Sequence, residues 1–223
     1  MNWTLPNILT ILRLLAAPGI AVMFLYFQRP WADWYALILF AVAAITDWLD
    51  GYLARSWKQE SRFGAMLDPI ADKAMVVIAL LVITGFSGMN PWLLLPATVI
   101  LFREVFVSGL REFLGTSAGL LKVTKLAKWK TTAQMVAIAV LFAAGVFEHY
   151  LGMQSMGMDE QMLIDILQGR EDDVLGLGWK NDGMIWSFRI GVILLWVAGA
   201  LTLITGWDYF AKSLPYLKDE DTK

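Results

Sequence analysis

One short stretch sets both the architecture and the chemistry of this chain. It reads Asp47-Trp48-Leu49-Asp50-Gly51-Tyr52-Leu53-Ala54-Arg55, then eight residues, then Gly64-Ala65-Met66-Leu67-Asp68-Pro69-Ile70-Ala71-Asp72. An unpaired carboxylate is costly to bury in hydrocarbon, so acids inside a membrane protein usually face an ion, a partner or a wet cavity. On helices, the first two aspartates are three positions apart and the last two are four apart, so each pair shares one face. Two helices that present such pairs to each other form an all-oxygen site for a hard divalent cation such as Mg²⁺.

The composition predicts a membrane protein rather than a water-soluble one. Of the 223 residues, 58% are hydrophobic, and the 11 tryptophans suit the interfacial belts of a bilayer-spanning protein. The net charge is only −2, which argues against a nucleic-acid partner. The chain has no cysteine, so disulfides, thiolate metal sites and cysteine nucleophiles are excluded. His149 is the single histidine, so a histidine-based metal centre is not expected either.

Six apolar segments are each long enough to cross a bilayer, which takes about 20 residues. They predict an all-α, polytopic membrane protein with six transmembrane helices. No repeat or low-complexity linker divides the chain, so one domain over 1–223 is expected, with an acidic, non-cytoplasmic insertion at about 148–184. Within that insertion, 158–167 is predicted to form a short amphipathic helix lying on the membrane. The six spans are expected at roughly 8–27, 34–53, 64–86, 92–114, 131–147 and 185–211.

The charges of the connecting segments predict the orientation of these spans. Lysine and arginine gather at 55–62, at 115–130 and in the C-terminal tail, which lie on one side of an even-numbered topology. The positive-inside rule places that side, with both termini, in the cytoplasm. The four aspartates then lie near the cytoplasmic ends of the second and third spans. The acidic insertion lies on the opposite side, where a tolerated surface insertion is its simplest interpretation.

The spacing of the fixed residues, D-x2-D-G-x2-A-R-x8-G-x3-D-x3-D, resembles at every defined position the signature of the CDP-alcohol phosphotransferases. The resemblance implies the fold of that membrane family and the transfer of a phosphatidyl group from CDP-diacylglycerol to an acceptor alcohol, with release of CMP. It also implies a pair of Mg²⁺ or Mn²⁺ ions, because positioning and charge neutralisation carry most of a phosphoryl transfer. Carried over position by position, Asp47, Asp50, Asp68 and Asp72 are the metal ligands. Asp72 is in addition the catalytic base that deprotonates the acceptor hydroxyl.

The small and basic residues of the signature are expected to bind the CDP-lipid. Gly51 and Ala54 lie one helical turn apart, and their small side chains let a nucleotide approach the backbone; tight helix–helix packing is the alternative. Arg55 can grip a diphosphate with two hydrogen bonds, or it can extend to the membrane surface instead. Gly64 begins the stripe, at a spacing of four, that carries the last two aspartates.

A second polar stripe lies on the first span, where Asn7, Thr10 and Arg13 recur at a spacing of three. These side chains are expected to face the same polar cavity as the aspartates. Contact with the CDP-lipid, which we assign to Asn7, and a structural hydrogen bond within the helix bundle are equally compatible with the pattern.

Three further segments, 5–18, 102–114 and 128–135, resemble the bacterial phosphatidylglycerophosphate synthases within this family. The resemblance covers residues 1 to about 147 and the last span, and it implies glycerol 3-phosphate as the acceptor. A phosphate dianion needs fixed cations, although stop-transfer and lipid-headgroup charge are alternative roles for basic residues here. The residues expected to form the acceptor-phosphate pocket are Arg103, Arg111, Lys128 and Lys130.

Other functions are compatible with parts of the pattern. The same chemistry could serve phosphatidylglycerol as acceptor, as in a cardiolipin synthase of this fold, or serine, or an inositol phosphate. A divalent-cation transporter and a catalytically silent membrane scaffold belong to different classes. A transporter needs ligands near mid-membrane and access from both sides, whereas these acids cluster towards one face. Metal-dependent release of CMP separates the enzymes from both.

The resemblance also implies partners and a location. CDP-diacylglycerol, glycerol 3-phosphate and membrane lipids are expected to bind, and nucleic acid is not. Members of the family are commonly homodimers, so a homodimer is expected, although no interface can be read from the sequence. The expected location is a bacterial inner (cytoplasmic) membrane, with the active site facing the cytoplasm.

Overall fold

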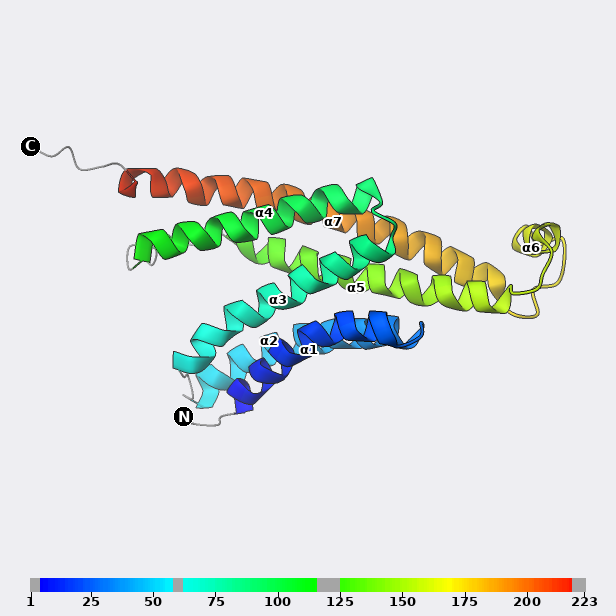
Figure 1. Ribbon diagram of the computed structural model, residues 1–223, viewed down its shortest axis with the longest axis horizontal. Coiled ribbons are helices and arrows are strands. Elements are labelled where there is room, and N and C mark those ends of the chain that lie inside the picture. Colours follow the sequence, from blue (N-terminus) through cyan, green and yellow to red (C-terminus); the bar gives the residue numbers. More distant parts are fainter. Residues whose placement is uncertain (1–4, 58–61, 116–124, 218–223) are drawn as a thin grey trace, which may run out of the picture.

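Helices and short connections account for the whole described chain. The computed structural model describes residues 5–57, 62–115 and 125–217; for some helical residues, 47–57 among them, it describes the backbone but not the side chain. No strand occurs in these ranges, which confirms the all-α prediction. The long helices form an elongated bundle in which α1 begins and α7 ends at the same end (Figure 1). The elements are α1 (Leu5–Tyr26), α2 (Trp31–Trp57), α3 (Arg62–Phe86), α4 (Pro91–Leu114), α5 (Lys125–Gln154), α6 (Glu160–Leu167), α7 (Leu177–Ser213) and the 3₁₀ turn η2 (Leu214–Tyr216).

Four of these helices, α1, α4, α5 and α7, are long and apolar enough to cross a membrane. Within the described residues, α2 contributes only a shorter apolar stretch, Trp31–Ala43. α3 is not among the four, and its first half carries the charged residues Asp68, Asp72 and Lys73. The structure therefore supports an all-helical protein with four candidate spans, and the expected crossing of the membrane by α2 and α3 as well stays a prediction.

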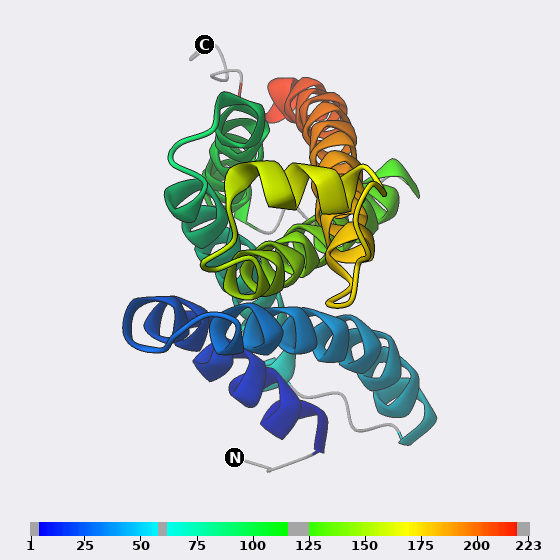
Figure 2. The same cartoon turned by 90° about the vertical axis from the view of Figure 1, so that its right-hand side faces the viewer.

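Small residues allow close approach of the helices in the core. Ala17 of α1, Ala36 of α2 and Ala79 of α3 are completely buried, and α1 packs against both α2 and α3. Close backbone approach through small side chains is a main source of packing energy between membrane helices. Larger residues such as Phe40 and Ile138 fill the space between α2 and α5. α5 lies between the layer of α1 and α2 and the helices α4 and α7 (Figure 2).

Much of the acidic segment is helical. The expected spans stopped at 147 and resumed at 185, but α5 continues to Gln154 and α7 already begins at Leu177. Both helices run beyond the ends of α1–α4, and α6 lies across their tips (Figures 1 and 2). α6 falls inside the predicted 158–167 helix, with Ile166 buried and Met162 52% exposed. A position of α6 on the membrane surface stays a prediction.

The start of α7 is held by a side-chain cap. The backbone N–H groups of Leu177 and Gly178 donate to the carboxylate of Asp173 at 2.6 and 2.8 Å. These amides belong to the first turn, where helix geometry offers no backbone acceptor. Asp173 therefore fixes the point at which the acidic segment turns back into the bundle.

Candidate active site

The polar stripe of α1 lies directly against the carboxylate stripe of α3. Thr10 Oγ1 donates to Asp68 Oδ1 at 2.6 Å, and Arg13 Nη1 donates to Asp72 Oδ1 at 2.9 Å. Spacings of three and four both return to the same helix face, so the two stripes meet in register. Of the two roles left open for the α1 stripe, Thr10 and Arg13 take the structural hydrogen bond. Asn7, expected to contact the CDP-lipid, is buried one turn earlier on α1.

Arg13 also connects this pair of helices to α2. Its Nη2 donates to Thr46 Oγ1 at 3.1 Å, and the Thr46 hydroxyl donates to the carbonyl of Ala43 at 3.1 Å. The Arg13 side chain is only 5% exposed, so its charge is satisfied by these partners rather than by bulk water. Thr46 immediately precedes Asp47. One guanidinium thus brings the start of the first aspartate pair close to Asp72 of the second.

Several predicted site residues lie outside the side chains that the structure describes. The backbone of α2 is helical through residues 47–55, so the i, i+3 spacing of the first aspartate pair does place both aspartates on one helix face. No contact is assigned to their side chains. They are Asp47, Asp50, Gly51, Ala54 and Arg55, together with Lys128 in the first turn of α5.

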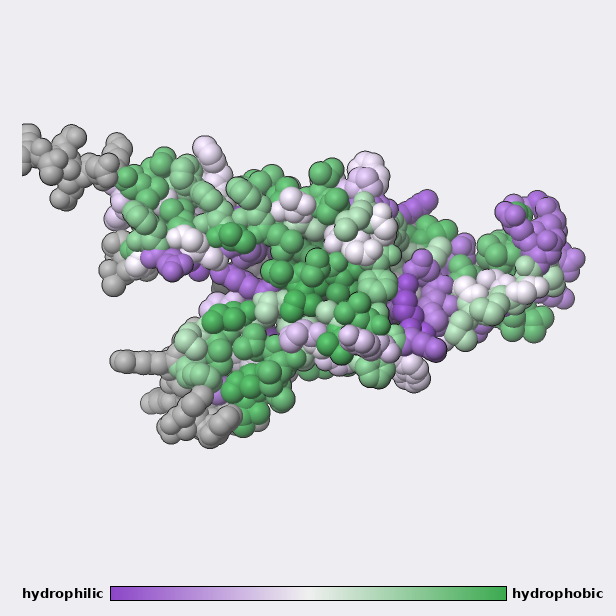
Figure 3. All heavy atoms as spheres, in the orientation of Figure 1, coloured by the Kyte–Doolittle hydropathy of each residue, from purple (hydrophilic) through white to green (hydrophobic). Residues whose placement is uncertain are grey.

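The two described aspartates are suited to bind a cation. Asp68 is exposed, and the Asp72 side chain is 43% exposed, so both keep carboxylate oxygen surface open. Gly64 is buried in the first turn of α3, one turn before Asp68. The molecule is hollowed at this end, between α1–α3 and the pair α4 and α7, and hydrophilic residues line the hollow (Figure 3). Among the side chains described, no three acidic or histidine groups come together, because only half of the expected ligand set is among them.

A cluster of basic residues surrounds one carboxylate where α3, α4 and α5 meet. Glu104 of α4 forms ion pairs with Arg103, at 3.1 Å, and with Lys130 of α5, and all three side chains are largely buried. Lys73 of α3 donates to Ser108 Oγ at 2.5 Å, one turn further along α4 from Glu104. Three cations thus face a single acid in a low-dielectric setting. Such an arrangement has an excess of positive charge and favours binding of a small anion.

The structure describes the side chains of three of the four residues expected to form the acceptor pocket, namely Arg103, Arg111 and Lys130. Arg103 and Lys130 both form ion pairs with Glu104 and therefore lie close to each other. The Arg111 guanidinium instead lies 5.3 Å from the centre of the Tyr209 ring on α7, and its side chain is exposed. Arg111 is therefore not in contact with the Glu104 cluster, and its expected place in a common pocket with Arg103 and Lys130 stays a prediction.

Two residues of this region were not singled out from the sequence. Lys73 directly follows Asp72, and neighbouring helical positions point about 100° apart, so Lys73 turns towards α4 while Asp72 turns towards α1. The sequence does contain a signal for Lys73, because a lysine directly follows a motif aspartate. Thr46 carried no comparable signal, because threonine is common in membrane helices and its hydroxyl usually bonds to its own helix.

The similarity to known proteins extends over most of the chain. Residues 3–166 match the CDP-alcohol phosphatidyltransferase family. A protein of Cereibacter sphaeroides (strain ATCC 17023) named CDP-diacylglycerol--glycerol-3-phosphate 3-phosphatidyltransferase is 68% identical over 221 residues, which is 99% of this chain and 100% of its own length. Proteins of the same name from Salmonella choleraesuis and Shigella boydii are 40% identical over 156 residues, 69% of this chain and 85% of theirs.

Proposed function

Because this chain belongs to the CDP-alcohol phosphatidyltransferase family, we propose that it transfers the phosphatidyl group of CDP-diacylglycerol to sn-glycerol 3-phosphate, giving phosphatidylglycerophosphate and CMP. The relative that is 68% identical over 99% of the chain carries the name of this reaction. The resemblance of three sequence segments to the bacterial synthases of this group supports the same acceptor.

The geometric observation that carries the proposal is the divergence of two consecutive side chains on α3. Asp72 points to Arg13 on α1, and Lys73 points to Ser108 on α4, beside the Arg103–Glu104 pair. A proton acceptor and a cationic cluster therefore lie on adjoining faces of one helix. Glycerol 3-phosphate carries a nucleophilic hydroxyl and a phosphate on the same three-carbon frame. It can therefore contact the proton acceptor with its hydroxyl and the cationic cluster with its phosphate at the same time.

The proposed chemistry is a direct phosphoryl transfer. The acceptor hydroxyl oxygen forms a bond to the phosphorus that carries the diacylglycerol, the bond from that phosphorus to CMP breaks, and Asp72 takes the hydroxyl proton. Arg13 Nη1 lies 2.9 Å from Asp72 Oδ1, and this contact holds the carboxylate towards the cleft. Two Mg²⁺ or Mn²⁺ ions held by Asp47, Asp50, Asp68 and Asp72 would neutralise the diphosphate charge in this reaction. Asn7, Gly51, Ala54, Arg55 and Gly64 are proposed to bind the CDP-lipid.

The Glu104 cluster is proposed to select the acceptor by its phosphate. Arg103 Nε is buried and has no hydrogen-bond partner among the described residues, so one donor is available for a phosphate oxygen. Arg103 is held against α7, where a β-carbon at Gly206 would lie 2.9 Å from Arg103 Cγ. Lys130, and with it Lys128 and Arg111 at the cytoplasmic mouth, would complete the phosphate contacts. Neutral acceptors such as serine would leave these cations without an anion.

The location follows from the same arrangement. We propose that α2 and α3 complete six spans in a bacterial inner membrane, with the hollow at the Asp68–Asp72 end facing the cytoplasm, where glycerol 3-phosphate is dissolved. The basic segments on that side support this orientation. A homodimer is proposed from the resemblance to the family alone.

CMP release by the purified, detergent-solubilised chain tests the function. CDP-diacylglycerol and Mg²⁺ or Mn²⁺ would be supplied with glycerol 3-phosphate, phosphatidylglycerol, serine or inositol phosphate, with a chelator as the metal control and Asp72→Asn as the protein control. We expect release only with glycerol 3-phosphate and only with metal. Release with another acceptor would keep the chemistry and overturn the phosphate pocket. Folded protein that releases no CMP with any acceptor would point to the scaffold or transporter class.

A further inference from the structure

A second cavity lies at the opposite end of α3 from the candidate active site. Its volume is about 520 Å³, within the range of small-molecule sites. Its walls are the end of α1, the start of α2, the end of α3, the start of α4, the second half of α5 and the first half of α7. Asp72 and the Phe86 wall of this cavity are about 20 Å apart along α3, at 1.5 Å per residue. The cavity is therefore separate from the cleft that holds Asp68 and Asp72.

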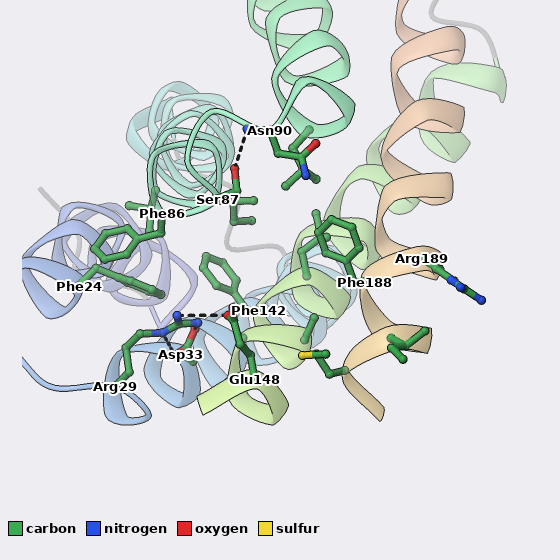
Figure 4. Close-up of a pocket in the computed structure, with 18 residues that line it drawn as sticks. Phe24, Arg29, Asp33, Phe86, Ser87, Asn90, Phe142, Glu148, Phe188 and Arg189 are labelled. Atoms are coloured by element: carbon green, nitrogen blue, oxygen red, sulfur yellow. Dashed lines mark hydrogen bonds and ion pairs between the residues drawn. The ribbon is translucent and has the colours of Figure 1, made fainter. Parts of the chain in front are cut away.

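One side of the cavity is built from aromatic rings. Phe24, Phe86, Phe142 and Phe188 come from four different helices and stand around the space (Figure 4). The Phe24 ring centroid lies 5.0 Å from that of Phe86 and 5.8 Å from that of Phe142. Aliphatic side chains of α3, α4 and α5 complete this wall. A hydrocarbon chain placed here would be buried against apolar surface.

The other side of the cavity carries a fixed cation. Arg29 Nε donates to Asp33 Oδ2 at 2.6 Å, and Arg29 Nη2 donates to Asp33 Oδ1 at 3.0 Å. Asp33 is only 2% exposed, and a β-carbon at Gly145 of α5 would collide with both side chains of the pair. Two-point hydrogen bonding in a confined space fixes the plane of the guanidinium. Asp33 thus serves to orient Arg29 at the cavity edge.

The remaining end of this guanidinium has a weak partner. Arg29 Nη1 lies 3.4 Å from Glu148 Oε2, longer than the 2.7–2.9 Å or so of a strong charge-assisted hydrogen bond. Glu148 is 62% exposed and lines the same cavity, so its carboxylate can turn to water. An anionic oxygen of a ligand could take its place on Nη1 while Asp33 keeps the arginine in position (Figure 4).

Exposed tryptophans indicate that the side of the cavity carrying Arg29 lies at the level of a bilayer surface. Trp31 begins α2 and Trp92 lies in the first turn of α4, and both are exposed beside the cavity. Trp186 of α7 is exposed as well, with the Arg189 guanidinium 5.9 Å from its ring centre. Tryptophan and arginine gather where hydrocarbon meets headgroups. The side of the cavity that carries Arg29 then lies among the lipid headgroups, and the side built from phenylalanine rings lies within the hydrocarbon.

We infer that this cavity binds one phospholipid of the leaflet opposite the active site. Its phosphate accepts from Arg29 Nη1, and one acyl chain follows the wall of phenylalanines. A free phosphate would use the arginine but leave the aromatic wall without an occupant, and a lone hydrocarbon would do the reverse. A phospholipid satisfies both sides, and as a ligand of the folded state it stabilises the protein.

The test compares a variant that removes the cation of the cavity with a variant that removes its exposed carboxylate. The double variant Arg29→Gln, Asp33→Asn removes the cation without leaving the buried Asp33 carboxylate unpaired. The single variant Glu148→Gln removes the carboxylate that competes with a ligand for Arg29 Nη1. Full-length protein in detergent would be titrated with dioleoyl phosphatidylglycerol or phosphatidylethanolamine, with native mass spectrometry and the unfolding temperature as readouts. Loss of one charged hydrogen bond should weaken binding about tenfold or more in the double variant. Glu148→Gln should bind as tightly as the wild type or more tightly.

A cavity-filling variant and a phosphate control complete the experiment. Ile185→Trp fills the cavity from α7 and leaves Arg29 and Asp33 unsubstituted, so it should also lower lipid binding even if the double variant fails to fold. Inorganic phosphate alone should give no comparable rise in unfolding temperature. Lipid binding by the double variant and by Ile185→Trp equal to that of the wild type, or equal stabilisation by inorganic phosphate, would overturn the inference. CMP release with glycerol 3-phosphate should stay unchanged in Glu148→Gln, because Glu148 is remote from Asp72.

Discussion

Arg13 Nη1 lies 2.9 Å from Asp72 Oδ1, so a buried guanidinium of α1 holds the carboxylate that is proposed to deprotonate the acceptor. The same guanidinium bonds Thr46 on α2 at 3.1 Å. Arg13 therefore fixes the separation of the three helices on which the site is built. We regard it as a positioning residue, because it is placed to act through Asp72.

Replacing Arg13 should lower turnover more than substrate binding. Loss of a hydrogen bond between charged groups corresponds to about 10- to 100-fold in rate if it is needed only in the transition state. We expect Arg13→Gln to reduce kcat by that amount with KM for both substrates nearly unchanged, and Arg13→Lys to restore part of it. Steady-state kinetics with both substrates varied measures this split. An Arg13→Gln enzyme with normal kcat but a lower unfolding temperature would leave Arg13 a purely structural role.

Asp72→Asn should abolish turnover while the protein still binds CDP-diacylglycerol. The amide keeps the size of the side chain and can still accept from Arg13 Nη1, but it cannot take the acceptor proton. Isothermal titration with CDP-lipid and single-turnover CMP release measure the two properties separately. Near-normal turnover by this variant would exclude Asp72 as the required base.

Thr10→Val should weaken metal binding through Asp68. The Thr10 hydroxyl donates to Asp68 at 2.6 Å and so orients an expected ligand. Removal of such a supporting hydrogen bond typically costs about 10- to 100-fold in metal affinity. We expect the Mg²⁺ concentration for half-maximal CMP release to rise by about tenfold or more, and Thr10→Ser, which keeps the hydroxyl, to behave like the wild type. An unchanged Mg²⁺ requirement in Thr10→Val would separate Asp68 from the metal site.

Lys130→Met should impair glycerol 3-phosphate binding more than Arg111→Ala does. Lys130 belongs to the buried cluster at Glu104, whereas Arg111 lies exposed over Tyr209. A charged contact in a largely buried site is stronger than one at the surface, so KM for glycerol 3-phosphate should rise about tenfold or more in Lys130→Met and less in Arg111→Ala. KM for CDP-diacylglycerol should stay the same in both. The reverse order would place the acceptor phosphate at the mouth of the cleft.

Acid should loosen the start of α7 through Asp173. Backbone hydrogen bonds from Gly178 and Leu177 lower the pKa of this carboxyl below its usual value. A lowered folded-state pKa means that the contribution to stability is fully present above the unfolded pKa, about 3.9, and is lost as the pH falls through the folded value. Asp173→Ala should therefore lower the unfolding temperature at pH 7, and the difference from the wild type should shrink towards pH 3. A difference that is independent of pH would point to packing rather than charge.

The fold and the reaction class were accessible from local patterns. Long apolar segments predicted each long helix, and the i, i+3 and i, i+4 spacing of the aspartates placed each pair on one face, because helix periodicity is a property of the backbone alone. The expected spans ended at 147 and resumed at 185, whereas the helices are longer, because α5 continues to Gln154 and α7 begins at Leu177. Hydropathy marks the extent of hydrocarbon, and a helix stabilised by a partner and a cap such as Asp173 need not stop there.

The spacing of eight fixed residues was enough to identify the family without any coordinates, and three further segments indicated the acceptor. The contacts that make a site depended on how the helices cross. The pairing of Arg13 with Asp72 spans 59 residues, and the meeting of Lys130 with Glu104 spans 26. Arg111 turned to Tyr209 of α7, although it shares α4 with Arg103. Helical periodicity defines which residues share a face, but the rotation and crossing of each helix come from the packing of small residues against distant partners. The Arg29–Asp33 cavity likewise exists only because six helices enclose it.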